Sequence, residues 1–215
     1  MRYSNILLFS GGLDSTVVAT MLKRSGCRTL LVHVDQGIRR HRLAATAIAD
    51  RLGMPLHVCD LTSVTRSITR ESAYIPGHRM WLYLSALSVA DAHHADAIYT
   101  GEIAFPDDPD NDRTNKDFHN YLEGSNDVTQ EAWKSNRQRF VELYSNMFEN
   151  AVDAYDIIDP LWGMRKREVV ALGVTLGAPL YLTSSCRNPT EYEDCKICWA
   201  CQSRQRALLS ANVDF

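Results

Sequence analysis

Short apolar runs alternate with longer amphipathic segments along most of the chain. Apolar runs bounded by glycine or polar residues predict buried strands, and segments with apolar residues every three or four positions predict helices. The predicted strands are Ile6–Phe9, Thr29–Val34, Leu56–Asp60, Ala97–Thr100 and Tyr155–Ile158. The predicted helices are Thr16–Arg24, Leu43–Leu52, Arg79–Ala92, Gln130–Phe148 and Lys166–Leu176.

This alternation predicts an α/β fold, in which βαβ units build a single doubly wound, Rossmann-like parallel sheet with helices on both faces. The carboxyl ends of all strands then lie at one edge, where such sheets bind ligands. With 215 residues, the chain is expected to form one domain, 1–215. The polar stretch 102–126 contains no predicted strand and is interpreted either as a functional loop or as a solvated one.

The first predicted strand ends in Ser10-Gly11-Gly12 and is followed directly by a helical segment. A strand that turns through glycines into a helix N-terminus exposes backbone N–H groups, and the helix dipole adds positive potential. The spacing matches neither a P-loop nor a dinucleotide fingerprint. The turn therefore predicts a phosphate site of another kind. Its candidate nucleotide-binding residues are Phe9, Ser10, Gly11, Gly12, Leu13, Asp14, Ser15 and Thr16.

Four cysteines near the C-terminus have the spacing C-x8-C-x2-C-x2-C; they are Cys186, Cys195, Cys198 and Cys201. Four thiolates at this spacing favour a tetrahedral zinc site in segment 186–201, with Cys198 and Cys201 at the start of a helix over Trp199–Leu209. Iron–sulfur ligation and unliganded thiols are the competing interpretations. The other two cysteines, Cys27 and Cys59, are expected to be small buried hydrophobic residues.

Two further positions belong to the expected ligand edge. Lys166 begins a predicted helix just after a strand and a proline turn, so its ammonium group would reach the phosphates; a solvated surface lysine is the alternative. Val34 ends the second strand, and its backbone could flank an adenine. The basic residues 39–42, which come next in the chain, could meet phosphates or a substrate carboxylate, or form a solvated helix start.

Composition narrows the functional classes. The formal net charge is −3 and the hydrophobic content is 45%, which argues against broad electrostatic binding of nucleic acid. Apolar runs are too short for a membrane span, and a secretory signal is not recognised. We therefore expect a cytoplasmic protein with reduced cysteines and without direct nucleic-acid binding.

Several segments resemble the 7-cyano-7-deazaguanine synthase (QueC) family of PP-loop ATP pyrophosphatases. These segments are FSGGLDST, DQGIRRHR, PGHRMWLYLSALSVADAHHADAIYTGE, DPLWGMRKRE and the four-cysteine spacing. The resemblance implies that ATP lies along residues 9–19 with Mg²⁺ on its phosphates, that Asp14 and Lys166 are catalytic, and that Zn²⁺ occupies the cysteines. It also implies a substrate-binding set: Arg40, His41, His78, Arg79, Gly101, Glu102, Asp110 and Arg113.

The implied reaction adenylates the carboxylate of 7-carboxy-7-deazaguanine, and ammonia then displaces AMP to give an amide. A second adenylation and loss of AMP convert the amide to the nitrile. The resemblance further implies a homodimer. No covalent protein nucleophile is required, so catalysis would depend on positioning and charge stabilisation.

The substrate end departs from the family pattern. The family motif PGRN is Pro76-Gly77-His78-Arg79 here, and the family loop Tyr-Pro-Asp-Cys-Arg is replaced by residues 108–113. These departures favour a paralogue, and the main alternative is a QueC-like antiviral-defence enzyme that joins the deazaguanine to an amine of a partner protein. A tRNA-modifying enzyme and a nucleotide-binding subunit without turnover are the remaining hypotheses.

Overall fold

The computed structural model describes residues 2–68, 78–103, 139, 142, 155–187 and 193–213. Its strands are β1 (Asn5–Leu8), β2 (Thr29–Asp35), β3 (Leu56–Asp60), β4 (Ala97–Tyr99) and β5 (Asp156–Ile158). Its helices are α1 (Leu13–Arg24), α2 (Arg39–Leu52), α3 (Thr62–Ile68), α4 (His78–His93), α7 (Lys166–Leu176) and α8 (Trp199–Ser210), with a short 3₁₀ helix, η2 (Leu180–Leu182).

The five strands form one parallel sheet in the order β3-β2-β1-β4-β5, which confirms the predicted architecture. The chain first winds outward from β1 through β2 to β3 and then returns to the other side of β1 with β4. The direction of winding therefore reverses between β1 and β4. In doubly wound sheets, ligands bind at the carboxyl ends of strands at this reversal.

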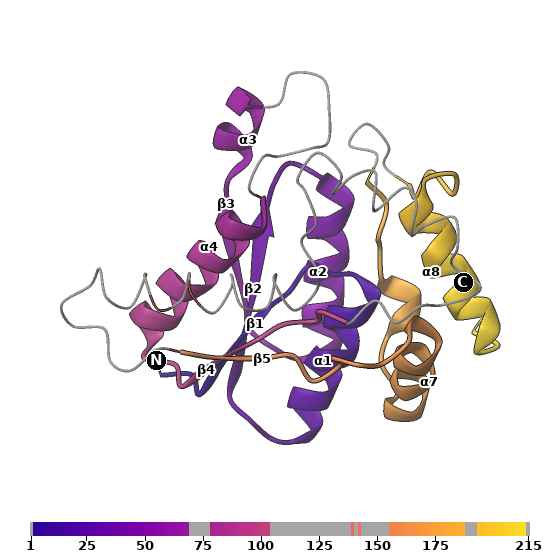
Figure 1. The fold of residues 1–215 in the computed structure, drawn as a ribbon, viewed down its shortest axis with the longest axis horizontal. Coiled ribbons are helices and arrows are strands. Elements are labelled where there is room, and N and C mark those ends of the chain that lie inside the picture. The colour runs from indigo at the N-terminus through magenta and orange to yellow at the C-terminus, as the bar shows by residue number, and fades with distance from the viewer. Residues whose placement is uncertain are drawn as a thin grey trace.

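Both faces of the sheet are covered by helices (Figure 1). Helices α1, α2 and α7 pack on the face that carries Leu7 and Leu31, whereas α4 packs on the face that carries Ile6 and Ile98. Successive residues of β1 thus alternate between two cores, so the strand is apolar throughout, as expected for a central parallel strand. Packing on both faces therefore fixes the position of β1, and with it the point at which the following turn begins.

The structure agrees with some predicted elements and corrects others. Strand Leu56–Asp60 and helix Lys166–Leu176 have the predicted bounds, but α1 and α2 begin three and four residues earlier than predicted, at Leu13 and Arg39. Helix α3 was not predicted, since its Thr- and Ser-rich sequence carries only a weak helical pattern. The predicted helix Gln130–Phe148 lies outside the described residues except for positions 139 and 142, which are helical.

The prediction for Cys27 was wrong, and that for Cys59 was right only in part. Cys27 is exposed and Cys59 is half-buried. Cys27 lies in the turn between α1 and β2, where the chain runs at the surface. Within the described part of the chain, each helix is too short or too polar to cross a membrane.

Candidate functional site

A pocket of about 420 Å³ opens at the carboxyl ends of β1, β2 and β4. One wall is the turn after β1, and another is formed by α4 and the residues after β4. A further wall comes from residues 183–187 and 193–204, which together are named the cysteine segment. The residues that line the pocket include Phe9, Ser10, Gly12, Leu13, Asp14, Ser15, His33, Val34, His41, Arg79, Gly101, Glu102, Lys166, Ser184, Ser185, Arg187, Ser203 and Arg204.

The turn after β1 is built mainly by its backbone. Gly11 has a φ of +76°, and a Cβ atom there would lie 2.7 Å from the backbone nitrogen of Ala45. Gly12 is the N-cap of α1 and offers no side chain to the first helical N–H groups. The hydroxyls of Ser15 and Thr16 donate to the Gly12 carbonyl at 3.1 and 2.8 Å. The resulting turn presents uncapped helix N–H groups to the pocket, which suits phosphate oxygens.

Asp14 and Lys166 meet inside this pocket. Lys166 Nζ lies 2.7 Å from Oδ1 and 2.5 Å from Oδ2 of Asp14, and both side chains are 24% exposed. The start of α7 is fixed by Glu168, whose carboxylate accepts the Arg165 N–H at 2.7 Å. Lys166 is therefore the first residue of its helix, as predicted, and its ammonium group lies beside Asp14 at the start of α1. Its role toward phosphates stays a prediction.

The end of β4 packs tightly against the start of α1. A Cβ atom on Gly101 would lie 2.7 Å from the backbone nitrogen of Ser15, so a larger residue would disturb the first turn of α1. Thr100 donates its hydroxyl to Asp159 at 2.6 Å and accepts the Glu102 N–H at 3.1 Å. These contacts hold Gly101 and Glu102 at the pocket edge.

His33 lies on β2 beneath the turn. Its Nδ1 is 2.9 Å from the carbonyl oxygen of Phe9, and because a carbonyl only accepts, Nδ1 carries the hydrogen. Burial lowers the pKa of His33, although the hydrogen bond to Phe9 and the charge of Asp35 oppose this shift. The neutral imidazole thus ties β2 to the residue that precedes the phosphate-binding turn.

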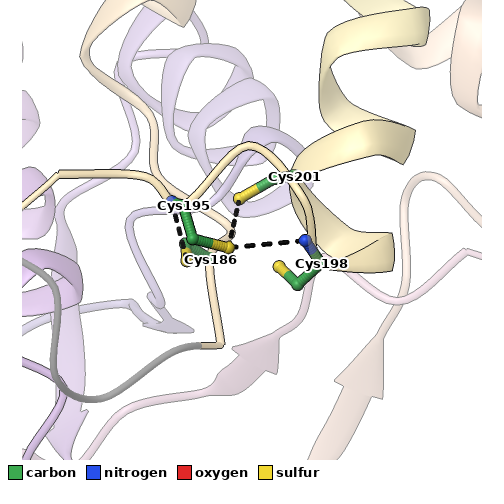
Figure 2. A group of neighbouring side chains, drawn as sticks. All are labelled: Cys186, Cys195, Cys198 and Cys201. Carbon is green, nitrogen blue, oxygen red and sulfur yellow. Dashed lines mark hydrogen bonds between the residues drawn. The ribbon is translucent and has the colours of Figure 1, made fainter.

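The four predicted metal ligands converge (Figure 2). The Sγ atoms of Cys186, Cys195, Cys198 and Cys201 all lie within 4.8 Å of one another, and those of Cys195 and Cys201 are 4.0 Å apart. Sulfur atoms of a tetrahedral zinc site with Zn–S bonds of about 2.3 Å are separated by about 3.8 Å. The four thiols therefore fit a zinc ion with small adjustments. As predicted, these two cysteines lie at the start of a helix: Cys198 is the N-cap residue of α8, without a side-chain cap hydrogen bond, and Cys201 lies in the first turn.

The local environment shifts the pKa values of the cysteine thiols in different directions. The Cys198 N–H donates to Cys195 Sγ at 3.4 Å and helps to lower the pKa of Cys195 to about 6. Burial raises the pKa of Cys201. A metal ion would remove this difference, because thiolate coordination replaces the proton at every ligand.

The predicted substrate-binding residues fall into three groups. Arg79, Gly101 and Glu102 line the pocket. His78 begins α4 but its side chain is not described, and Asp110 and Arg113 lie outside the described residues. Arg40 and His41 form the third group, since both contact the cysteine segment.

Arg40 is buried with 5% exposure and donates to the Glu193 carbonyl; it is not among the described pocket-lining residues. His41 lines the pocket, and its Nε2 donates to the Cys186 carbonyl at 2.7 Å. Burial lowers the pKa of His41 to about 4, so its imidazole is neutral at pH 7. The start of α2 therefore holds the backbone of the cysteine segment at the first predicted metal ligand, Cys186, and at Glu193, two residues before the second.

The predicted nucleotide-binding residues fall into two groups, those that line the pocket and those that do not. Most of its residues, together with Val34 and Lys166, line the pocket, whereas Gly11 and Thr16 support the turn from behind. Thr16 is fully buried.

Sequence reasoning missed the pocket residues of the cysteine segment, Ser184, Ser185, Arg187, Ser203 and Arg204. One signal was available for Arg204, which lies three residues after Cys201 and thus on the same side of α8.

The described part of the chain has a five-stranded parallel sheet, with a glycine turn and an Asp–Lys pair at its winding reversal. This is an α/β architecture of the doubly wound class, in which nucleotides bind at this edge of the sheet. The family model described as "Queuosine biosynthesis protein QueC" matches residues 4–212, and the chain belongs to this family.

Individual relatives agree with this assignment. The chain is 32% identical to a 7-cyano-7-deazaguanine synthase of Methanothrix thermoacetophila, over 97% of this chain and 95% of that protein. It is 29% identical to the synthase of Koribacter versatilis, over 97% and 90% respectively. Among solved structures, the NMN synthetase of Francisella tularensis has a TM-score of 0.50 at 15% identity, covering 98% of this chain and 84% of that one. That likeness supports the fold.

Proposed function

We propose that the chain is an ATP-dependent C–N ligase that converts 7-carboxy-7-deazaguanine and ammonia to 7-cyano-7-deazaguanine, with release of AMP and pyrophosphate. The observation that carries this proposal is the pocket in which the phosphate-binding turn faces the Asp14–Lys166 pair, in a member of the QueC family. We further propose that the chain acts as one domain and as a homodimer in the cytoplasm, without direct binding of nucleic acid.

The chemistry begins with activation of a poor electrophile. The substrate carboxylate attacks the α-phosphorus of ATP, the bond to the β-phosphate oxygen breaks, and pyrophosphate leaves. The N–H groups at the start of α1 and the Lys166 ammonium group are placed to stabilise the charge that develops on the phosphates. Asp14 would hold Mg²⁺ and would release Lys166 toward the phosphates when it does so.

The second half of the reaction replaces oxygen by nitrogen. Ammonia attacks the acyl carbon, a proton is lost and AMP leaves, which gives the amide. The amide oxygen then attacks the α-phosphorus of a second ATP, the bond to the β-phosphate oxygen breaks, and a second pyrophosphate leaves. Loss of AMP with the two remaining N–H protons gives the nitrile. Arg79, on the α4 wall, would bind the substrate carboxylate, and Glu102 would lie near the departing protons.

We propose that the four cysteines hold Zn²⁺, because the cluster found among the described residues consists of thiols alone and their spacing fits a ZnS₄ tetrahedron. This site is structural in the proposal, since a four-thiolate shell leaves no position for substrate. Elemental analysis of the purified protein would find zinc and not iron; iron in its place would overturn this part of the proposal.

The test of function is mass spectrometry of a reaction that contains the purified chain, ATP, Mg²⁺, 7-carboxy-7-deazaguanine and ammonium. We expect the nitrile together with AMP, and neither from an Asp14→Asn variant. AMP without released nitrile would favour the alternative acceptor, an amine of a partner protein, which the altered substrate-end motifs suggest. Absence of AMP would overturn the proposed function.

A further inference from the structure

The cysteine segment is hydrogen-bonded directly to the phosphate-binding turn. The Ser184 N–H donates to the Gly11 carbonyl at 3.1 Å, and the Ser184 carbonyl oxygen lies against Gly12, 3.6 Å from where its Cβ atom would be. Gly11 has a left-handed φ, and the side on which a Cβ atom would stand is closed by the backbone of α2. The turn that faces the phosphates therefore has the cysteine segment as one of its two supports.

Asp194 joins the separate stretches of this segment. Its Oδ1 accepts the Ser184 hydroxyl at 2.6 Å and its Oδ2 accepts Nη1 of Arg204 at 3.1 Å, while Arg204 Nε donates to the Thr183 hydroxyl at 3.0 Å. The side chains of Arg204 and Asp194 are only 11% and 20% exposed. Removing one partner of an ion pair this sheltered from water leaves the other charge uncompensated, so the network favours the arrangement in which all three stretches meet.

Each partner in this network lies close to a metal ligand in sequence. Ser184 precedes Cys186 by two residues, Asp194 immediately precedes Cys195, and Arg204 follows Cys201 by three. Metal binding brings the same three stretches together through sulfur. The hydrogen-bond network and the metal site thus require the same arrangement of the cysteine segment. In that arrangement the Ser184 N–H reaches the Gly11 carbonyl.

We propose that Asp194 is a positioning residue that couples metal occupancy to nucleotide binding. This inference rests on the proposed function, because it takes ATP as the ligand of the turn. Metal binding fixes the cysteine segment, Asp194 passes that constraint to Ser184, and Ser184 fixes the Gly11 carbonyl. Linkage is reciprocal, so bound nucleotide must also strengthen the retention of metal.

The experiment compares the full-length, zinc-loaded chain with Asp194→Ala, using α,β-methylene-ATP, in which the bond to be cleaved cannot break. Calorimetry in buffer with excess zinc gives Kd, and transfer of zinc to a chelator, with and without the analogue, gives the retention of metal. Asp96→Ala is the matched control, because Asp96 pairs with Arg2 at the surface, far along the chain from the cysteines.

We expect Asp194→Ala to keep its zinc, to bind the analogue roughly ten-fold more weakly, and to lose the protection that the analogue gives wild-type zinc against the chelator. The Asp96→Ala control should match the wild type in both measurements. A smaller folded fraction would lower the binding stoichiometry without changing Kd, so Kd separates positioning from a loss of folded protein.

An unchanged Kd and unchanged protection in zinc-loaded Asp194→Ala would overturn the proposal. If that variant loses zinc or fails to fold, Ser184→Ala decides, since it removes the hydroxyl that reaches Asp194 and keeps every cysteine and the N–H to Gly11. Ser184→Ala should then show a smaller change in the same direction, and wild-type values would overturn the proposal. A wild-type chain that does not bind the analogue would overturn both this inference and the proposed function.

Discussion

The glycine turn after β1 and the cysteine segment face the same pocket but are constructed in different ways. The turn is one continuous stretch that faces the pocket mainly with backbone atoms. Its glycines permit close approach of neighbouring backbone, and the N–H groups at the start of α1 are uncapped. The cysteine segment consists of separate stretches joined by side chains, through four thiols and the pair between Asp194 and Arg204.

This difference determines which kind of substitution damages each wall of the pocket. A turn made of backbone is damaged by adding atoms, because Gly11 and Gly101 each have a backbone nitrogen 2.7 Å from the position of a Cβ atom. A wall made of side chains is damaged by removing atoms, since each thiol or carboxylate closes a link between stretches. Single substitutions in the two walls can therefore break or sharpen this contrast, and the loss of a metal ligand should have the largest effect.

Removing one thiolate should undo the cysteine segment as a whole. For Cys198→Ser we expect zinc content to fall from about one ion per chain to near zero and Tm to fall by roughly 10 °C, because metal binding contributes directly to folding. Elemental analysis and a thermal melt measure the two effects. Cys27→Ser is the control, since Cys27 is exposed and lies outside the cluster. Full zinc occupancy with an unchanged Tm in Cys198→Ser would contradict a structural metal site.

Removing a side chain that acts chemically, and not structurally, should separate activity from stability. Asp14→Ala should lower the rate of AMP formation by about 100-fold or more, because the carboxylate acts where phosphate charge develops. Its Tm should fall far less than that of Cys198→Ser, because the substitution removes one ion pair, with Lys166, and no metal ligand. Asp50→Ala, on the surface of α2, should leave the rate unchanged. Normal turnover in Asp14→Ala would refute the assigned role.

Adding one methyl group should damage the turn. Gly11→Ala combines a left-handed φ of +76° with a 2.7 Å contact, and we expect it to lower the free energy of unfolding by about 2–4 kcal/mol. Gly26→Ala is matched in backbone conformation, with a φ of +74°, but has nothing within 4 Å of the added atom, so it should cost only about 1 kcal/mol. Urea unfolding measures both variants, and equal losses would show that the close contact is irrelevant.

The smallest predicted effect is a pH dependence of stability that arises from His33, which lies beneath the turn after β1. Burial lowers the pKa of His33 in the folded chain, so the unfolded chain takes up the proton first as pH falls below about 6.5. Stability from the neutral imidazole is therefore present above that pH and is lost as pH falls toward the folded pKa. His33→Asn keeps an N–H for the Phe9 carbonyl and should show a smaller drop in Tm from pH 7 to pH 5. Because acid release of metal affects both proteins, the difference between their slopes is the measurement, and parallel slopes would remove His33 as the cause.

The same contrast explains what could be predicted from the sequence. The turn after β1 was predictable because its signal is local: an apolar strand, two glycines and a helix in order. The cysteine cluster was predictable because thiols that bind one metal ion must lie close together in the fold, even when they are separated in sequence. Lys166 could be placed beside the turn because strand ends in a parallel sheet share one edge.

Roles that arise only from tertiary contacts could not be predicted. Arg40 and His41 looked like groups for an anionic ligand, since a basic run after a strand usually faces the ligand edge. In the structure they hold the carbonyls of Glu193 and Cys186, more than 140 residues away in sequence. The start of α2 at Arg39 was missed for a related reason, because the charged residues 39–42 gave its first turn no apolar pattern. Asp194 carries no recognisable signal at all.

The order of the walls along the chain has a consequence for how the protein is made. Synthesis runs from the N-terminus, so the turn after β1 is made well before Cys201 and Arg204. If the cysteines hold zinc as proposed, acquisition of the metal would be the step that completes the pocket. A cell that is short of zinc would accumulate newly made chains that have the sheet and the turn but lack one wall of the pocket, so metal supply would set the fraction of the protein that matures.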